Sequence, residues 1–271
     1  MIDEELAMKV EEAVRLIAAE EVMPRWRRLA ADEVAVKTAP HDLVTVADRR
    51  AEERLTEILP RLLPGSVVVG EEAVAADPAT YGRLAGDAPV WIVDPVDGTR
   101  QFVEGDPGFC TLVGLAHRGV LEGAWTHAPA LGLTARARRG AGAFLDGERL
   151  VAGVPEPGRP LTVAHAHPHY TSAEQKRVLA RLRVEGVAPR ECGSAGLEYL
   201  RVARGELDAV AFDWESAWDH AAGLLLVLEA GGVHETVAGV PFALAGGNAL
   251  PFTAARDEPT ARRILSLLSG A

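Results

Sequence analysis

Hydrophobic positions recur at helical spacing over residues 3–29. From residue 6 to residue 17 an apolar side chain stands at every third or fourth position, and glutamates occupy the other faces. This pattern predicts an amphipathic helix that is interrupted near Pro24. A second apolar stripe over residues 45–59 predicts another helix, which Pro60 is expected to stop.

Short apolar runs follow, each bounded by glycine, proline or charged residues. They predict strands at residues 67–69, 90–93, 111–116 and 120–126. Arg118–Gly119 and Asp146–Gly147 predict tight turns between neighbouring strands. The first part of the chain is therefore expected to form a mainly antiparallel sheet.

Predicted strands and helices alternate beyond Leu161, which is typical of an α/β layer arrangement. The strands are expected at residues 161–164 and 209–212, and the helices at residues 172–182, 195–203 and 220–229. The proline-rich residues 154–160 predict a boundary between an N-terminal α+β half, residues 1–154, and a C-terminal α/β half, residues 155–271. We expect the two halves to form one unit.

The amino-acid composition limits the kinds of protein that this chain can be. The chain has 271 residues, 48% of them apolar, so it is long enough to bury a large core. It contains no uncharged apolar run of eighteen residues, and its N-terminus is acidic, so a cytoplasmic location is expected. Cys110 and Cys192 stand far apart among apolar or small residues, which favours buried thiols over a disulfide framework.

The formal net charge of −11 argues against nucleic acid or an anionic membrane as the main partner. The negative charge also matters if the chain acts on a phosphate ester. A positive charge must then lie between its carboxylates and the substrate. A divalent cation satisfies this requirement.

Acidic side chains follow directly after the apolar strand predicted at residues 90–93. Asp94 and Asp97 are separated by Pro95–Val96, and Gly98–Thr99 allow a tight turn after them. Partly desolvated carboxylates are costly unless a cation neutralises them, and Mg²⁺ prefers such oxygen ligands together with backbone carbonyls. An Asx-type turn is the plain structural alternative for this pair.

Other acidic residues also lie next to apolar segments. Gly70–Glu71–Glu72 ends another apolar strand, and Trp218–Asp219 opens an almost wholly apolar helix, where an N-cap is the structural alternative for Asp219. Asp42 and Asp48 flank Thr45, which is expected to cap the second helix. If Gly98 and Thr99 open a helix, their N–H groups would point at an anion such as a phosphate.

In this order, Gly70–Glu71–Glu72, residues 94–99 and Trp218–Asp219 resemble the signatures of the inositol monophosphatase superfamily, over roughly residues 42–232. The resemblance implies a layered αβαβα sandwich of the inositol monophosphatase/fructose-1,6-bisphosphatase type. It also implies Mg²⁺-dependent, lithium-sensitive hydrolysis of a small-molecule phosphate monoester by direct attack of a metal-activated water. Because the family is often dimeric, a homodimer is expected.

The resemblance assigns metal ligands. Glu71, Asp94 and the carbonyl of Val96 would hold one Mg²⁺, and Asp94, Asp97 and Asp219 a second. Glu71 would also touch a third, weaker ion, so that the site holds two to three ions.

The same resemblance assigns catalytic and binding roles. Glu71 and Thr99, the latter oriented by Asp48, would position and deprotonate the attacking water. Gly98 and Thr99 would bind the phosphate. The residues expected to contact the rest of the substrate are Asp97, Gly193, Ser194 and Asp213.

One departure leaves the substrate open. Inositol-specific members carry an acidic residue seven positions before the tryptophan-linked aspartate, where this chain has Phe212. Asp213 or Glu215 could take over that contact, or the substrate is histidinol phosphate, a sugar phosphate or a nucleoside 3′,5′-bisphosphate. A non-catalytic homologue that binds metal or phosphate is the alternative of another class.

The sequence assigns three further groups of residues less specifically. His165, His167 and His169 alternate, so a strand would place them on one side as a metal site, but Pro168 and the following Tyr170–Thr171–Ser172 turn favour a loop over the cleft. Arg136, Arg138 and Arg139 are expected on a solvated face or at a subunit contact. His220 is expected to hydrogen-bond nearby backbone.

Overall fold

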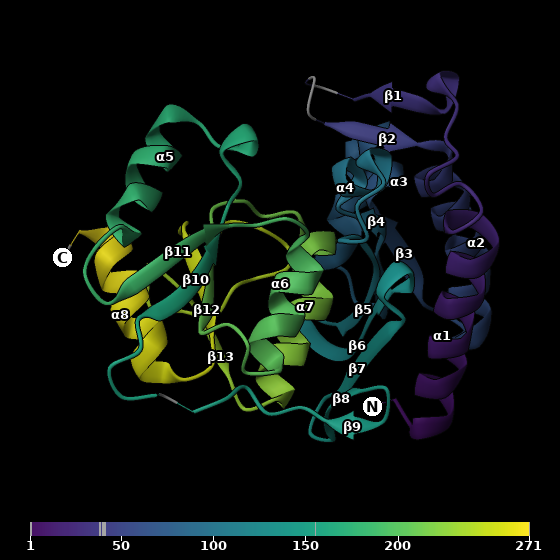
Figure 1. The fold of residues 1–271 in the computed structure, drawn as a ribbon. Helices are drawn as coiled ribbons and strands as arrows, with labels where there is room; N and C mark the ends of the chain where they lie inside the picture. The colour runs from purple at the N-terminus through teal and green to yellow at the C-terminus, as the bar shows by residue number, and fades with distance from the viewer. Residues whose placement is uncertain (1, 38, 40–41, 155, 271) are drawn as a thin grey trace.

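Two β-sheets with a pair of helices between them form the centre of the molecule (Figure 1). The structure, a computed structural model, describes residues 2–37, 39, 42–154 and 156–270. Pro155, where the second half of the chain was expected to begin, lies outside these residues. Among the described residues, no helix combines the length and the apolar content needed to cross a membrane.

The larger sheet has the strand order β3-β4-β5-β6-β7-β8-β9 in the described part of the chain. Its strands are β3 (Val67–Gly70), β4 (Val90–Asp97), β5 (Cys110–His117), β6 (Val120–Ala128), β7 (Leu133–Arg138), β8 (Gly142–Leu145) and β9 (Glu148–Arg149). β3 pairs with β4 in parallel, and every later pair is antiparallel. The four strands predicted from apolar runs are therefore confirmed, and so is the antiparallel character.

The smaller sheet has the order β11-β10-β12-β14-β13. Its strands are β10 (Leu161–His165), β11 (Val187–Glu191), β12 (Ala209–Phe212), β13 (Val233–Thr236) and β14 (Phe252–Ala255). β10 is parallel to β11 and β12, whereas β14 runs antiparallel to both of its neighbours. A separate antiparallel pair joins β1 (Val34–Val36) and β2 (Leu43–Thr45).

Helices cover both sheets and give five layers (Figure 1). α1 (Glu4–Ile17) and α2 (Val46–Leu62) cover the outer face of the larger sheet, and α6 (Ala195–Ala203) and α7 (Ala217–Glu229) lie between the sheets. α5 (Ala173–Leu179) and α8 (Glu258–Ser269) cover the smaller sheet from outside. The short helices α3 (Glu71–Ala76) and α4 (Thr99–Glu104) follow β3 and β4 directly. The predicted αβαβα sandwich is confirmed.

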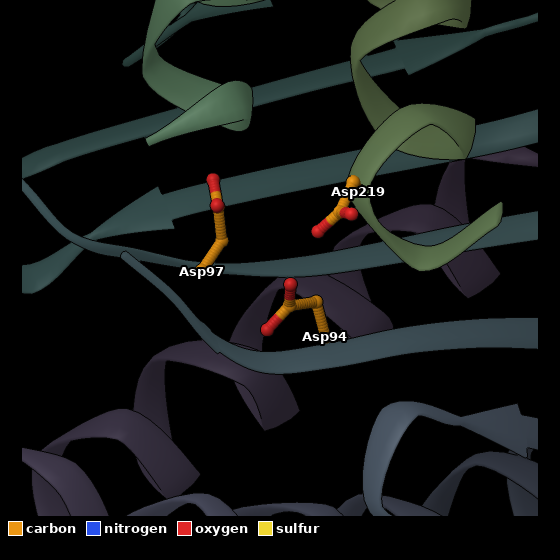
Figure 2. Close-up of side chains that lie close together, drawn as sticks. All are labelled: Asp94, Asp97 and Asp219. Atoms are coloured by element: carbon orange, nitrogen blue, oxygen red, sulfur yellow. The ribbon is translucent and has the colours of Figure 1, made fainter. Parts of the chain in front are cut away.

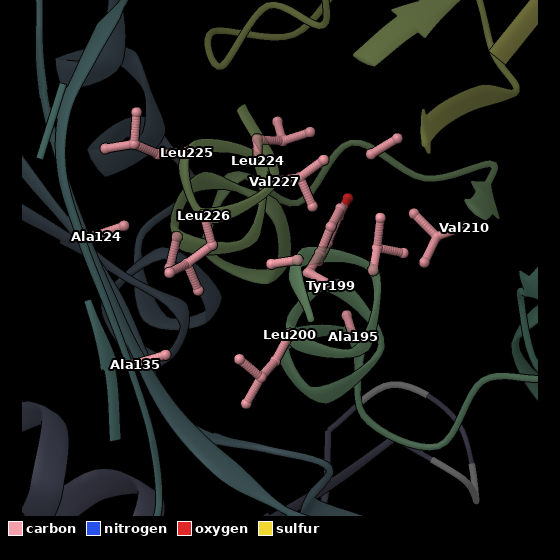
Figure 3. Packing of buried hydrophobic residues seen from close by; sticks show 14 of the residues in the cluster. Ala124, Ala135, Ala195, Tyr199, Leu200, Val210, Leu224, Leu225, Leu226 and Val227 are labelled. Atoms are coloured by element: carbon pink, nitrogen blue, oxygen red, sulfur yellow. The ribbon is translucent and has the colours of Figure 1, made fainter. Parts of the chain in front are cut away.

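The apolar residues of α7 form the middle of the core. Leu224, Leu225 and Leu226 are buried, and the helix packs against Ala124 on the larger sheet and against Tyr199 of α6 (Figure 3). At Gly223 a Cβ atom would lie 2.1 Å from a ring carbon of Tyr199. Only glycine allows the two helices to approach so closely. A helix that is apolar on all sides is thus explained by sheets on both of its flanks.

The outer helices differ from the predicted pattern in two ways. Helix α1 ends at Ile17 and continues as a π-helical turn over Ala18–Val22, before Pro24 is reached. Helix α2 does not stop at Pro60 but runs to Leu62, with Pro60 inside its last turn. A proline so near the end removes a single backbone hydrogen bond, which the packing of the rest of α2 tolerates.

Arg136 and Arg138 of β7 are partly buried, whereas Arg139, just beyond this strand, is exposed and lies 3.5 Å from Glu122. Arg136 pairs with Glu4 at 2.5 Å and with Glu11 at 3.2 Å, and Arg138 pairs with Glu4 at 2.7 Å. These ion pairs connect α1 to β7, an inner strand of the larger sheet. The predicted solvated position holds for Arg139 but not for Arg136 and Arg138, because their partners on α1 become neighbours only after folding.

Candidate active site

Three aspartates from two distant segments converge at one edge of the larger sheet (Figure 2). Asp94 and Asp97 stand at the end of β4, and Asp219 is the third residue of α7. One carboxylate oxygen of each lies within 4.8 Å of the others. Because β3 and β4 are parallel, Glu71 after β3 is brought to this same edge.

The end of β4 presents its aspartates by breaking the regular ladder. All eight residues of β4 are buried, and its pairing with β5 shifts register between Asp94 and Asp97. Asp94 Oδ1 accepts a hydrogen bond from the amide of Val96 at 3.0 Å. The Asx-type turn is therefore present, and it serves to aim Asp94 and Asp97 toward one cluster.

Asp97 is held by the start of α6. Its Oδ2 accepts hydrogen bonds from Ser194 Oγ and from the amide of Gly196, both at 2.6 Å, and Oδ1 accepts one from the amide of Ala195 at 3.2 Å. The Cys110 thiol also contacts Oδ2 at 3.4 Å. A carboxylate with these donors has a fixed orientation, and they oppose the rise that burial causes in its pKa.

Asp219 is not the N-cap of its helix, as the structural alternative had it. Helix α7 begins at Ala217 with Ser216 as the N-cap residue, so Asp219 lies inside the first turn. Its Oδ2 accepts a hydrogen bond from Trp214 Nε1 at 2.6 Å. The predicted backbone contact of His220 is confirmed, since Nε2 lies 3.0 Å from the carbonyl oxygen of Trp214. This contact fixes the loop that carries Trp214.

Lys37 was missed by the sequence analysis. Its ammonium donates to Glu71 Oε1 at 2.6 Å and also to Glu72. Burial opposes the charged form of Lys37, but the two carboxylates outweigh it and raise the pKa of the lysine. A single lysine on an irregular segment carries no sequence signal that separates it from a solvated one. Only the fold places this cation beside Glu71.

Glu52 was also missed, and it positions the segment that carries Glu71. Its carboxylate accepts hydrogen bonds from the amide of Glu72 at 2.8 Å and from that of Ala73 at 2.7 Å. A Cβ on Gly70 would lie 2.3 Å from the Glu52 carboxyl carbon, so glycine is required there. Burial raises the pKa of Glu52 to about 7.

Glu52→Gln is expected to lower the free energy of unfolding by about 1–3 kcal/mol, because the amide nitrogen of glutamine cannot accept a hydrogen bond from a backbone N–H. Urea denaturation at pH 8 measures this. Glu53→Gln is the matched control, since Glu53 is exposed and pairs with Arg50 on the surface. Equal midpoints for the two variants would contradict the positioning role.

Thr99 and Asp48 form a hydrogen-bonded pair near the aspartate cluster. Thr99 Oγ1 lies 3.2 Å from Asp48 Oδ1 and 3.0 Å from the carbonyl oxygen of Val96. Asp48 Oδ2 accepts from the amide of Thr45 at 2.8 Å and from its hydroxyl at 2.5 Å, which confirms Thr45 as the cap of α2. Burial raises the pKa of Asp48 to about 6. Gly98, at φ 89°, precedes α4, whose start at Thr99 was predicted.

These residues line a cavity of about 870 Å³, a size that suits a small-molecule substrate. The predicted site residues on its wall are Glu71, Asp94, Val96, Asp97, Gly98, Thr99, Gly193 and Asp219. His167 and Tyr170 also line it, so the segment after β10 forms part of the cavity wall, as expected for a loop over the cleft.

Three predicted residues lie behind this wall and do not line the cavity. Asp48 acts through Thr99, and Ser194 acts through Asp97. Asp213 is buried, its Oδ2 has no hydrogen-bond partner in the described part of the chain, and burial raises its pKa to about 6. Trp214, the next residue, faces the cavity instead.

The acidic cluster is chemically suited to a divalent cation. Burial raises the pKa of Asp94, that of Asp219 to about 7 and that of Glu71 to about 8, and the neighbouring acids add to each rise. Mg²⁺–O distances of about 2.1 Å place ligands up to about 4.2 Å apart, so oxygens within 4.8 Å need only a small inward adjustment. A bound cation would remove the cost of ionising these groups.

Comparisons with a family and with individual proteins both point to inositol monophosphatases. The inositol monophosphatase family matches residues 3–265. An inositol-1-monophosphatase of Rhizobium meliloti is 38% identical over 208 residues, which is 74% of each chain, and human inositol monophosphatase 1 is 33% identical over 218 residues, 78% of this chain and 77% of the human one.

The fold also matches a solved structure. The inositol monophosphatase (IMPase) of Thermotoga maritima superposes with a TM-score of 0.80 at 26% identity, covering 97% of this chain and 96% of the other. Members of the matched family are phosphomonoester hydrolases that are generally metal-dependent and act on small phosphorylated substrates. The chain described here belongs to the inositol monophosphatase family.

Proposed function

We propose that this chain hydrolyses a small-molecule phosphate monoester with two to three Mg²⁺ ions bound at the aspartate cluster. The observation that carries the proposal is the convergence of Asp94, Asp97 and Asp219 within 4.8 Å beside the Glu71 and Thr99 side chains. Carboxylates with raised pKa values at the wall of a cavity are typical of functional sites.

The proposed ligands are the cluster acids. Glu71, Asp94 and the carbonyl of Val96 would hold one ion, and Asp94, Asp97 and Asp219 another. When bound, the ions supply charge neutralisation for the phosphate and lower the pKa of water. Lys37 already places one positive charge next to Glu71. The acidic residues thus become compatible with an anionic substrate.

The attacking water is proposed to be held by Thr99 and Glu71. Asp48 accepts a hydrogen bond from the Thr99 hydroxyl, which leaves a lone pair of Oγ1 free to accept a hydrogen bond from water. The water oxygen forms the new bond to phosphorus as its proton passes either to Glu71 or to Thr99, whose own proton then moves to Asp48. The bond to the ester oxygen breaks, and the alkoxide takes up a proton from a second water. The backbone N–H groups of Gly98 and Thr99 are proposed to bind the phosphate.

Contacts with the rest of the substrate are proposed for Asp97 and Gly193, which line the cavity. Ser194 orients Asp97 and does not reach the cavity wall. Phe212 is buried against Tyr199 and Phe252 and offers no polar contact. The names of the Rhizobium and human relatives make inositol 1-phosphate the first ester to test.

A phosphate-release assay over a panel of phosphomonoesters tests this function. We expect release that stops when EDTA removes divalent cations and returns when Mg²⁺ is added in excess. Protein that binds Mg²⁺ in calorimetry and releases no phosphate from any ester would instead identify a non-catalytic homologue. The same preparation, examined by light scattering, tests the expected homodimer.

A further inference from the structure

One cation on the wall of the cavity has no counter-charge bound to it. Arg100 is the second residue of α4 and lines the cavity. Across the described residues it forms no ion pair or hydrogen bond, and its Nε is shielded from solvent without an acceptor. A guanidinium carries five N–H donors in a planar fork, so an anion is its natural partner.

The other cations at the cavity differ from Arg100. Lys37 is occupied by Glu71 and Glu72, and Arg49 is exposed to solvent. Arg100 alone among these three combines a partly buried position with unused donors. Leaving a shielded donor unpaired is unfavourable, and a bound ligand would remove that cost.

The charge of Arg100 acts on two aromatic rings of the same cavity wall. Lys37 is the cation that most affects Glu71. Arg100 instead acts on two rings of the opposite half: burial first, and then Arg100, lowers the pKa of His167, and Arg100 opposes the rise that burial causes in the pKa of Tyr170. His167 and Tyr170 line the same cavity. Both ring nitrogens of His167 are engaged, since Nδ1 accepts from the amide of His169 at 3.2 Å and Nε2 lies 3.4 Å from Glu191. Arg100 is therefore the group on this part of the wall that supplies unused donors.

This part of the wall is not needed for the phosphate that reacts. In the proposed function that phosphate is neutralised by cations at the acid cluster and lies at Gly98 and Thr99. The donors of Arg100 would therefore meet a different part of the substrate. A guanidinium fits an oxyanion there, since its planar fork donates paired hydrogen bonds to phosphate or carboxylate oxygens.

We propose that Arg100 forms a second anion subsite on the cavity wall, so that the preferred substrate carries a phosphate or carboxylate in addition to the phosphate that is hydrolysed. This inference rests on the proposed phosphatase function and narrows its substrate class. It disfavours histidinol phosphate, whose second functional group is a cation.

Matched substrate pairs test the subsite. 3-Phosphoglycerate against glycerol 3-phosphate isolates a carboxylate, and fructose 1,6-bisphosphate against fructose 6-phosphate isolates a second phosphate. The wild type is expected to favour the doubly anionic member of at least one pair by about tenfold or more in kcat/KM. The pair that responds identifies which anion is recognised.

Arg100→Gln is expected to raise KM for the doubly anionic member by about tenfold to a hundredfold and to change the other member by less than about twofold. Arg100→Lys keeps the charge but lacks the planar guanidinium. Its KM for the doubly anionic member should therefore lie between those of the wild type and Arg100→Gln. Arg262→Gln is the control for net charge, because Arg262 pairs with Glu258 on the surface of α8. Arg262→Gln should change KM for neither member of the pair.

Equal losses for both members in Arg100→Gln would overturn the subsite and assign Arg100 to the reacting phosphate or to the fold. A wild type that prefers the singly anionic members would overturn it as well. If no ester is hydrolysed, titration calorimetry of the same pairs with Mg²⁺ present replaces kinetics. A preference in binding that disappears in Arg100→Gln then supports the subsite although the phosphatase proposal has failed, and equal binding of both members rejects it.

Discussion

Asp94→Asn is expected to lower kcat for phosphate release by about a thousandfold or more, because losing a shared metal ligand removes several kcal/mol of transition-state stabilisation. Asp94 lies among several acids, since Glu71, Asp97 and Asp219 all add to the rise that burial causes in its pKa, and it is proposed to bind both ions. The measurement is kcat at saturating Mg²⁺ with an ester that the wild type hydrolyses.

The fold should survive this change. The asparagine side chain keeps an oxygen that accepts the Val96 amide, and the substitution removes one negative charge from a crowded group. Asp87→Asn, at a largely exposed side chain that pairs with Arg118, is the control and should retain full activity. An Asp94→Asn enzyme that turns over within tenfold of the wild type would exclude Asp94 as a ligand of both ions.

Asp97→Asn is a less informative variant, although Asp97 belongs to the same cluster. Its two oxygens accept hydrogen bonds from Ser194, Ala195 and Gly196. An asparagine would turn an NH₂ group toward at least one of these donors. A loss of activity there would therefore mix a missing ligand with a displaced α6.

Protein stripped of divalent cations is expected to be more stable toward urea at pH 5.5 than at pH 8, by at least about 2 kcal/mol. The folded-state pKa values of Glu71, about 8, and Asp219, about 7, lie above the ordinary values of 4.5 and 3.8. Between these limits the folded chain binds more protons than the unfolded one. Stability therefore falls as pH rises from about 4 to about 8.

Mg²⁺ should abolish most of this pH dependence, because a bound cation neutralises the carboxylates that the protons would otherwise neutralise. Urea denaturation at the two pH values, with EDTA or with excess Mg²⁺, measures the effect. In EDTA at pH 8, Asp219→Asn should be more stable than the wild type, whereas Asp87→Asn should match it. A chelated wild type with equal stability at both pH values would show that the acids carry no such repulsion.

Much of the architecture was predictable because it follows from local patterns. Apolar runs bounded by turn residues located four strands of the larger sheet, and helical spacing located α6 at residues 195–203. Acids placed directly after the apolar strands β3 and β4 predicted a site at their carboxyl ends. The structure brings these acids to one edge because β3 and β4 are parallel.

The predictions that failed concerned segments whose partners are distant in sequence. Arg136 looked solvated until α1 supplied Glu4 and Glu11. The N-cap alternative for Asp219 was wrong because Ser216, a favoured N-cap residue, takes that place. Asp213 stays a predicted substrate contact, and its buried side chain does not line the cavity.

The sequence by itself determined the family, the layered fold and the acids that follow the apolar strands, since each is recognised from short motifs and local apolar patterns. Only the tertiary structure decided that Lys37 neutralises Glu71, that Glu52 caps α3 and that Arg100 lies unpaired beside His167. Electrostatic partners are set by distance in space and by burial. Sequence spacing fixes neither quantity once the partners lie in different elements.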